Sequence, residues 1–274
     1  MNFTASVNLN CLNYFINFDE ITTKIKVGEG GFGEVFLGVW IGKKVAVKKL
    51  TLKNFKFKDN LNKFINEINI ISSLRHPNIV LYMGASINQS NYYMITEYLP
   101  RGSLFDYLHR DRGKLNERDQ INIAYEIAVA LKYLHSRNII HCDLKSSNIL
   151  IDDNWKIKIG DFGLSRFYNK GNDDTRGRIG TPHWMAPEVL KGEKYETSAD
   201  IFSYGMILWE ILSREIPYYG INPYQVISLV ADKKQIVQVP AEGNQALRKI
   251  IAKCLEYESH KRPKLDEVVD YLQN

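Results

Sequence analysis

The chain has 274 residues, of which 45% are apolar and 24% are charged. These proportions are typical of a globular protein and exclude disordered, collagen-like and coiled-coil chains. The length corresponds to one large domain or two lobes and is sufficient to bury a core. The net charge of +5 is small and spread along the chain, so we expect no nucleic-acid partner.

The cysteines and the N-terminus indicate an intracellular protein. Cys11, Cys142 and Cys254 have neither disulfide-framework nor zinc-ligand spacing, which fits a reducing compartment. We expect no signal peptide, because no basic residue precedes Lys24 and no continuous apolar segment is present. The most apolar stretch, 199–212, is too short and too polar to span a bilayer, and we interpret it as a helix buried in the protein centre. We therefore expect a cytoplasmic protein without membrane insertion.

The first part of the chain is rich in predicted strands. Residues 1–20 are rich in Asn and lack periodicity, and we interpret them as an N-terminal extension or linker. The pattern that follows predicts strands and one helix, in which apolar residues from Leu61 to Leu74 recur at helical spacing. The predicted strands are 24–28, 34–40, 44–50, 81–87 and 92–98.

From Ser103 onward the pattern is mostly helical. Apolar residues between Ile121 and Leu134 predict one long amphipathic helix. A short hairpin, 149–151 with 156–159, follows it. The Pro- and Gly-containing segment 99–103 is the predicted hinge between the two halves. Further helices are predicted at 198–213, 222–232, 243–255 and 264–273.

A glycine-rich segment lies between the first two predicted strands. Gly28-Glu29-Gly30-Gly31-Phe32-Gly33 has the pattern G-x-G-x-x-G, in which glycines let backbone amides approach phosphate oxygens. Alone, this pattern is also typical of an ordinary glycine hairpin. A dinucleotide-binding oxidoreductase needs a helix after the motif, whereas 34–40 has the pattern of a strand. We therefore interpret the glycines as the turn of a hairpin that covers a nucleotide.

Two charged residues in apolar elements each need a partner. Lys48 follows Val45-Ala46-Val47 in a predicted strand and shares a face with Ala46, whose small side chain leaves room for a ligand. Glu67 lies on the apolar stripe of the predicted helix, where an unpaired carboxylate is unfavourable. An ion pair between Lys48 and Glu67 satisfies both groups. The alternative is that each side chain lies at an edge, in solvent.

A polar loop between two apolar runs carries carboxylate and amide groups. This loop is His141–Asn148, and Asp161-Phe162-Gly163 follows the next predicted strand. Asp143, Asn148 and Asp161 offer hard oxygen donors, which suit Mg²⁺ and phosphate rather than zinc. Each residue alone is also typical of turn capping, but their combination with the glycine pattern and a lysine favours phosphate chemistry.

In this order, the motifs resemble the signature set of the protein kinases. The set is completed by A-P-E at Ala186–Glu188, and the resemblance covers 21–274. It implies an α+β, bilobal protein-kinase-like fold that binds ATP in the cleft between its lobes. The expected N-lobe, 21–98, is a small antiparallel β-sheet with one helix. A hinge at 97–102 precedes a larger, mainly helical C-lobe at 103–274.

The resemblance also implies roles for individual residues. Asp143 accepts or orients the proton of the substrate hydroxyl, and Lys48, held by Glu67, contacts the ATP phosphates. Asp200 braces the catalytic loop, and Glu188 pairs with Arg262. The implied catalytic residues are Asp143, Lys145, Lys48, Glu67 and Thr181, and the implied ligands of Mg²⁺ or Mn²⁺ are Asn148 and Asp161. The implied ATP-binding residues are Val27, Gly28, Glu29, Gly30, Gly31, Phe32, Gly33, Val35, Ala46, Lys48, Thr96, Glu97, Leu99 and Leu150.

Some of these residues have more specific expected positions. Lys145 would lie near the transferring phosphate, Thr96 resembles a gatekeeper, and the backbone of Glu97 and Leu99 would bond the adenine edge. The residues that would enclose the adenine are Val35, Ala46 and Leu150.

The expected substrate is a serine or threonine hydroxyl in a protein. Lys145 and the sequence Gly180-Thr181-Pro182 are similar to the residues that serine/threonine kinases have at these positions. A contact between Lys145 and Thr181 would brace Asp143. With Gly163-Leu164-Ser165-Arg166 and Trp184-Met185, the chain resembles the tyrosine-kinase-like group, of the Raf and mixed-lineage type. The alternatives are a dual-specificity or tyrosine kinase and, in another class, a pseudokinase or scaffold that binds nucleotide without turnover.

One position departs from the family pattern. Cys142 stands where the family usually has an arginine, which pairs with a phosphate on the activation segment. We interpret Cys142 as a small filler, with a reactive thiol as the alternative, and we expect weak dependence on loop phosphorylation. The hydroxyls available between Asp161 and Glu188 are those of Ser165, Tyr168, Thr175 and Thr181.

Overall fold

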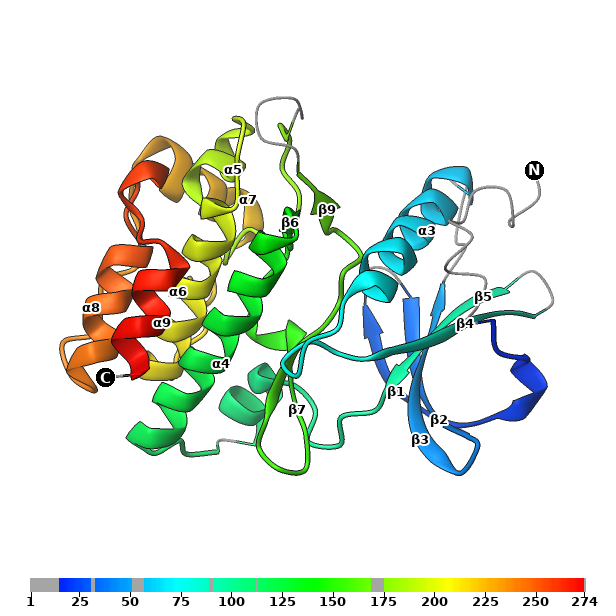
Figure 1. The fold of residues 1–274 in the computed structure, drawn as a ribbon. Helices are drawn as coiled ribbons and strands as arrows, with labels where there is room; N and C mark the ends of the chain where they lie inside the picture. Colours follow the sequence, from blue (N-terminus) through cyan, green and yellow to red (C-terminus); the bar gives the residue numbers. More distant parts are fainter. Residues whose placement is uncertain are drawn as a thin grey trace. The chain divides into compact units, whose positions relative to one another are not determined.

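The computed structural model describes residues 15–30, 33–50, 57–88, 91–111, 113–168 and 175–273. The chain forms two compact units that divide between Pro100 and Arg101 (Figure 1). Among the described residues, none of the helices has the length and apolarity needed to cross a membrane.

The first unit contains an antiparallel five-stranded sheet with the strand order β1-β2-β3-β5-β4. Every predicted strand is present, with ends that differ by at most three residues from the prediction, and the predicted helix α3 ends before His76 and Pro77. A 3-10 turn, Phe18–Glu20, precedes the sheet. The elements are β1 (Ile21–Gly30), β2 (Gly33–Trp40), β3 (Lys43–Leu50), α3 (Phe57–Ser73), β4 (Tyr82–Asn88) and β5 (Asn91–Glu97).

One face of this sheet carries the apolar core of the unit. Val45 and Val47 lie on this face because alternate residues of a strand point to the same side. Together with Ile95 of the neighbouring strand, they have no exposed surface. Ile16, Ile21 and Tyr93 complete this cluster. The residues between them, including Ala46 and Lys48, therefore point to the opposite face.

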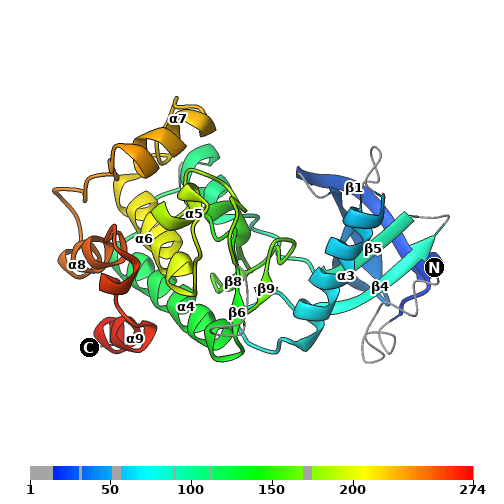
Figure 2. The ribbon, with the colours of Figure 1, turned by 90° about the horizontal axis from the view of Figure 1, so that it is seen from above.

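The second unit is mainly helical and is centred on α4 (Glu117–Ser136) and α6 (Ser198–Ser213), which pack side by side (Figure 2). Every residue from Ala199 to Ile211 is buried, which confirms the prediction of a buried helix there. The other α-helices among its described residues are α5 (Pro187–Lys191), α7 (Pro223–Ile227), α8 (Gln245–Cys254) and α9 (Leu265–Gln273). The short strands are β6 (Ile139–Ile140), β7 (Ile149–Ile151), β8 (Ile157–Ile159) and β9 (Arg166–Phe167).

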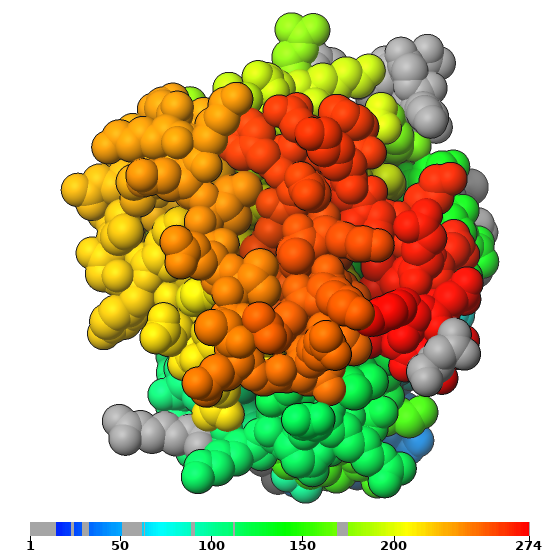
Figure 3. All heavy atoms as spheres, turned by 90° about the vertical axis from the view of Figure 1, so that its left-hand side faces the viewer, coloured from blue at the N-terminus to red at the C-terminus, as the bar shows by residue number. Residues whose placement is uncertain are grey.

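Local sequence explains where several helices begin. Asn116, Asn222 and Asn244 each accept hydrogen bonds from backbone N–H groups of the first turn of α4, α7 and α8. The predicted helix 222–232 is α7 followed by one π-helical turn, Ser228–Asp232. α8 and α9 pack on α6 and α4 and form the face of this unit that is coloured orange to red in Figure 3.

A buried ion pair fastens α5 to the region before α9. Arg262 donates from both terminal nitrogens to Glu188, at 2.6 Å and 2.8 Å, as the sequence predicts. The same guanidinium also donates to the carbonyls of Glu256, Tyr257 and Ser198. Its side chain has no exposed surface, so any lost contact leaves a charge or a carbonyl unpaired.

We predict that Arg262→Lys lowers the free energy of unfolding by about 2–4 kcal/mol, because an ammonium cannot reproduce the forked contacts of a buried guanidinium. The control is Arg110→Lys, at an exposed pair with Asp106, where we expect a loss below about 0.5 kcal/mol. Denaturant unfolding of both variants measures the difference. Equal losses at the two positions would show that the buried pair does not stabilise the fold.

Candidate active site

The sheet register of the first unit places several predicted ATP-binding residues on one face. In the β2–β3 pair Val35 lies opposite Lys48, and in the β3–β5 pair Ala46 lies opposite Thr96. Residues directly opposite in an antiparallel sheet point to the same side. Because Ala46 and Lys48 are two residues apart in β3, all four side chains share the face opposite the apolar core.

The glycine pattern forms a hairpin between β1 and β2, as predicted. Gly28 pairs with Val35 and Gly30 pairs with Gly33, while Gly31 and Phe32 lie outside the described residues. Gly33 has a φ of +150°, and a Cβ there would meet the Lys49 carbonyl oxygen at 2.0 Å. A side chain at this position is therefore excluded by the close approach of β3. At Gly28 a Cβ would meet Val35 alone among the described residues, at 3.8 Å.

The predicted ion pair between Lys48 and Glu67 is present. Lys48 Nζ lies 2.7 Å from Glu67 Oε1, and the two side chains are 16% and 4% exposed. Glu67 reaches β3 from α3, so the pair also fixes the helix against the sheet. The edge-in-solvent alternative is wrong for both residues.

Thr96 and Glu97 are the last two residues of β5, and Leu99 follows two residues after the strand ends. The Glu97 N–H donates to the Leu81 carbonyl at 3.0 Å, and the Glu97 carboxylate accepts from the Leu81 N–H at 2.7 Å. Two contacts thus hold Glu97 beside the start of β4. The side chain of Leu99 is buried, whereas Val27 in β1 is exposed.

In the second unit, the catalytic-loop residues form a closed set of hydrogen bonds. Asp143 Oδ1 accepts from the Thr181 hydroxyl at 2.8 Å, and Asp143 Oδ2 lies 2.8 Å from Lys145 Nζ. Lys145 also donates to Thr181 Oγ1 at 2.7 Å, so the predicted Lys145–Thr181 pair is confirmed. Asp143 is 6% exposed. Two partners from different segments therefore fix the orientation of a buried carboxylate.

Asn148 and Asp161 are brought together by the hairpin of β7 and β8. Ile149 lies opposite Ile159, and the Gly160 N–H donates to the Asn148 carbonyl at 2.9 Å, directly before Asp161. The Asn148 side-chain nitrogen donates to the Asp143 carbonyl at 2.8 Å. Its amide oxygen is therefore directed away from that contact and is available as a ligand. Leu150 is half-buried in the same β7 strand.

His141 holds the loop from within. Its ring is fully buried, with Nε2 3.1 Å from the Gly160 carbonyl, while Nδ1 accepts from the Asp143 N–H at 3.4 Å. A carbonyl only accepts, so Nε2 carries a hydrogen. The ring thus links the segment of Asp143 to the segment of Asp161.

Asp200, on the buried helix α6, accepts hydrogen bonds from the catalytic loop, as predicted. It accepts from the His141 N–H at 2.9 Å, the Cys142 N–H at 3.1 Å and His135 Nε2 at 3.0 Å. Complete burial opposes ionisation of this carboxyl, but the hydrogen bond from His135 and the neighbouring backbone donors outweigh it and lower its pKa. Asp200 is therefore ionised at neutral pH and braces the loop.

Comparison with known sequences agrees with this geometry. The sequence model of the protein tyrosine and serine/threonine kinase family matches residues 21–272. The chain belongs to this family. Its sheet-based first unit and helical second unit are the two lobes of the protein kinase fold.

The kinase domain is also similar to named serine/threonine-protein kinases. It is 40% identical to the probable serine/threonine-protein kinase SIS8 of Arabidopsis thaliana over 94% of this chain and 25% of that protein. It is 41% identical to the serine/threonine-protein kinase CTR1 of the same plant, over 93% of this chain and 31% of CTR1. It is 38% identical to the probable serine/threonine-protein kinase drkB of Dictyostelium discoideum, over 94% of this chain and 37% of drkB. The chain thus spans about a quarter to two fifths of the length of these relatives.

Sequence reasoning missed one buried residue of the kinase domain. Glu210 on α6 has no exposed surface and accepts from the Ser146 hydroxyl at 2.7 Å and from the Trp184 indole at 3.1 Å. His109 Nε2 lies 2.7 Å from the same carboxylate. The available signal was a second carboxylate within a mainly apolar helix, which needs partners from elsewhere in the chain. Glu210 therefore holds the catalytic loop and the segment after Thr181 at a second point.

The kinase domain contains two glycines that allow a matched test of the loop packing. Gly180 and Gly177 have similar φ angles of +117° and +121°, but a Cβ on Gly180 would meet the Cys142 carbonyl at 2.4 Å, whereas a Cβ on Gly177 would meet none of the described residues within 4 Å. We predict that Gly180→Ala costs about 2 kcal/mol more unfolding free energy than Gly177→Ala, because both add backbone strain and only the first adds overlap. Denaturant unfolding measures this difference, and equal losses would contradict the tight packing of Gly180 on the loop.

Proposed function

We propose that this domain transfers the γ-phosphoryl group of ATP to serine and threonine hydroxyls of protein substrates. The observation that carries the proposal is the set formed by Asp143, Lys145 and Thr181, in which a buried carboxylate is held by an ammonium and a hydroxyl. In phosphoryl transfer the protein contributes mainly positioning and charge stabilisation, and such a set supplies both.

Asp143 is the proposed group that receives the substrate hydroxyl. Its carboxylate orients the attacking oxygen and accepts its proton as the bond to phosphorus forms. Lys145 is fixed beside it and places a positive charge near the phosphoryl group that moves. Thr181 fixes the rotation of the carboxylate through its own hydroxyl. These residues act through their orientation, which the hydrogen bonds maintain before substrate binds.

Lys48 is the proposed contact to the ATP phosphates in the first unit. An ammonium group in an apolar setting needs a counter-charge, and Glu67 provides it at 2.7 Å. The pair directs Lys48 to the same face as Val35, Ala46 and Thr96. Backbone amides of the glycine hairpin, Gly28–Gly33 with Val27, would cover the phosphates. The N–H of Glu97 donates to Leu81. The proposed partners of the adenine edge are therefore the carbonyl of Glu97 and, two residues later, the N–H of Leu99.

Asn148 and Asp161 are the proposed ligands of a divalent cation. In the described part of the chain, no three His, Cys, Asp or Glu side chains gather as a self-sufficient metal site. This donor set fits Mg²⁺, which proteins bind through one or two carboxylates together with substrate phosphates. The cation, when bound, supplies charge stabilisation to the phosphates. Asp161, two residues after β8, adopts a left-handed φ of +59°, and Phe162, which follows it, is fully buried.

Serine/threonine specificity is supported by two observations. The relatives that match nearly the whole chain are named serine/threonine-protein kinases, and the Lys145–Thr181 pair resembles that class. The resemblance to the tyrosine-kinase-like group agrees with the same relatives. Retention of Lys48, Asp143 and Asp161 argues against the pseudokinase alternative. Because the relatives are two and a half to four times longer, the activity and partners of the whole protein are part of this proposal.

We predict that Asp143→Asn lowers kcat by about 10²–10⁴-fold, because the amide cannot accept the substrate proton. ATP affinity stays within about twofold, since Asp143 contributes to proton acceptance rather than to nucleotide binding. Transfer to a mixed serine, threonine and tyrosine peptide library, together with calorimetric ATP binding, measures both quantities.

The matched control is Asp153→Asn, which makes the same change at an exposed turn and is expected to leave both quantities unchanged. Strong residual turnover in Asp143→Asn would contradict the proposed role of Asp143 in accepting the substrate proton. Preferred transfer to tyrosine would overturn the proposed specificity.

A further inference from the structure

Tyr195 joins the activation segment to the catalytic loop within the second unit. Its backbone N–H donates to Thr175 Oγ1 at 3.0 Å, and its carbonyl accepts the hydrogen of the same hydroxyl. Thr175 has no exposed surface and Tyr195 is 2% exposed. The Thr175 hydroxyl is therefore used both as donor and as acceptor in a buried contact.

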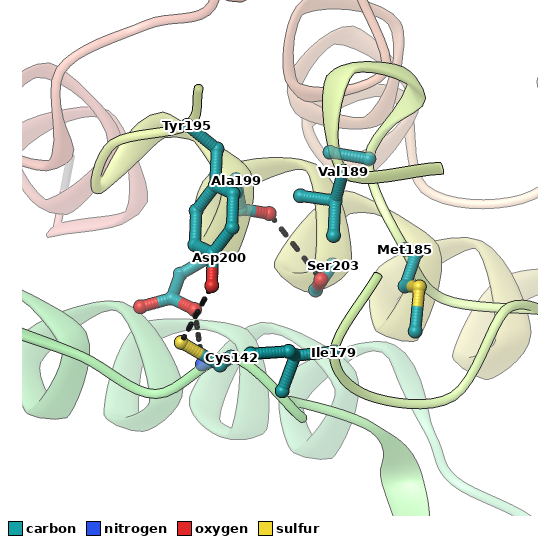
Figure 4. A pocket seen from close by; sticks show the side chains of 9 residues that line it. Cys142, Ile179, Met185, Val189, Tyr195, Ala199, Asp200 and Ser203 are labelled. Atoms are coloured by element: carbon teal, nitrogen blue, oxygen red, sulfur yellow. Dashed lines mark hydrogen bonds between the residues drawn. The ribbon is translucent and has the colours of Figure 1, made fainter. Parts of the chain in front are cut away.

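The Tyr195 side chain extends from this contact toward Cys142, the residue that stands where the kinase family usually has an arginine. Figure 4 shows its ring directed at Cys142 and Asp200, and its hydroxyl lies 3.7 Å from Cys142 Sγ. The guanidinium of Arg166 lies 5.3 Å from the centre of the ring. Asp200 accepts the Cys142 N–H at 3.1 Å. Tyr195 thus contacts β9, the catalytic loop and the segment of Thr175.

The two groups that face the Tyr195 side chain, the Cys142 thiol and the Arg166 guanidinium, are respectively uncharged and in contact with the aromatic ring. Burial, reinforced by Asp200, raises the pKa of the Cys142 thiol to about 12, so the thiol is uncharged at neutral pH. Arg166 lies over the aromatic ring of Tyr195. The hollow bounded by Cys142, Tyr195 and Met185 has a volume of about 10 Å³, which is enough for about one water molecule.

We propose that Thr175 and Tyr195 are positioning residues, and that the unmodified Thr175 hydroxyl holds the activation segment in the arrangement that supports phosphotransfer. This inference rests on the proposed function. A buried hydroxyl that donates to one backbone group and accepts from another contributes more than a solvent-exposed one, because its loss leaves both backbone groups unpaired. The segment from Thr175 to Thr181 would then be held by this contact at one end and by Asp143 and Lys145 at the other.

Modification of Thr175 is expected to break the contact. Transfer of a phosphoryl group from ATP would form a P–O bond at Thr175 Oγ1, break the β–γ phosphoanhydride bond, and release ADP and the hydroxyl proton. The oxygen would then have no hydrogen to donate to the Tyr195 carbonyl. It would also carry a charge of about −1.5 to −2 into a position with no exposed surface. Phosphorylation of Thr175 therefore inactivates the domain.

Three substitutions at Thr175 separate this role from general stability. Thr175→Val keeps the shape and removes the hydroxyl, and Thr175→Ser keeps the hydroxyl. Thr175→Glu places a negative charge there. The matched control is Thr197→Val, because Thr197 is two residues from Tyr195 and its side chain makes no capping hydrogen bond within the described part of the chain. For each purified domain the experiment measures kcat and KM for peptide phosphorylation and amide hydrogen exchange at Tyr195.

We expect Thr175→Val to lower kcat at least about tenfold, since two buried backbone groups lose their partner. Thr175→Ser and Thr197→Val should stay within about threefold of the unsubstituted domain, and Thr175→Glu should be no more active than Thr175→Val. Exchange of the Tyr195 amide should accelerate only in Thr175→Val and Thr175→Glu.

Unchanged kcat and exchange in Thr175→Val, or activation by Thr175→Glu, would overturn the inference. Mass spectrometry that finds phosphate on Thr175 in the active domain would also overturn it. Absence of phosphotransfer by the unsubstituted domain would instead refute the proposed function. In that case the exchange of the Tyr195 amide still decides whether the Thr175 hydroxyl holds the segment.

Discussion

The arrangement of the catalytic loop depends on one buried carboxylate, that of Asp200. Burial of an ionised group is unfavourable unless donors compensate it, and the compensation here comes from the backbone of His141 and Cys142 and from the ring of His135. The loop can satisfy this carboxylate in few conformations. That constraint fixes the backbone directly before Asp143, and the contacts of Asp143 with Lys145 and Thr181 follow from it.

Helix α6 provides two such anchors. Glu210 lies ten residues after Asp200, or about 15 Å along the helix, and it accepts from Ser146 and Trp184. The catalytic loop and the segment after Thr181 are therefore attached at two points to one helix, which is buried from Ala199 to Ile211. Neutral contacts at Tyr195 add a third attachment for the activation segment. A fold that positions its reactive groups in this way needs little rearrangement of the second unit during chemistry.

The parts of the structure that follow local rules were predictable from the sequence. Strand alternation predicted the two faces of β3, helical spacing placed Glu67 on the apolar side of α3, and α6 was recognised as buried because its apolar residues lie on all sides. The contacts that were missed join distant segments through single polar groups. Thr175 with Tyr195, and Glu210 with Ser146, carry no periodic signal, because a hydrogen bond across the fold requires only one suitable atom at each end. The short elements α5, β6 and β9 were missed because they contain too few residues for a pattern.

The most direct measurement of this account is the ionisation of Asp200 in the folded domain. The carboxyl carbon shift of Asp200 can be followed by NMR as the pH is lowered from neutrality. Because its pKa is lowered from the ordinary value of 3.8, its contribution to stability is present above that value and is lost as the pH falls through the folded pKa. We predict that Asp200 stays ionised at every pH above 3.8 at which the domain is folded. Protonation of Asp200 in the folded domain at or above that value would contradict the account.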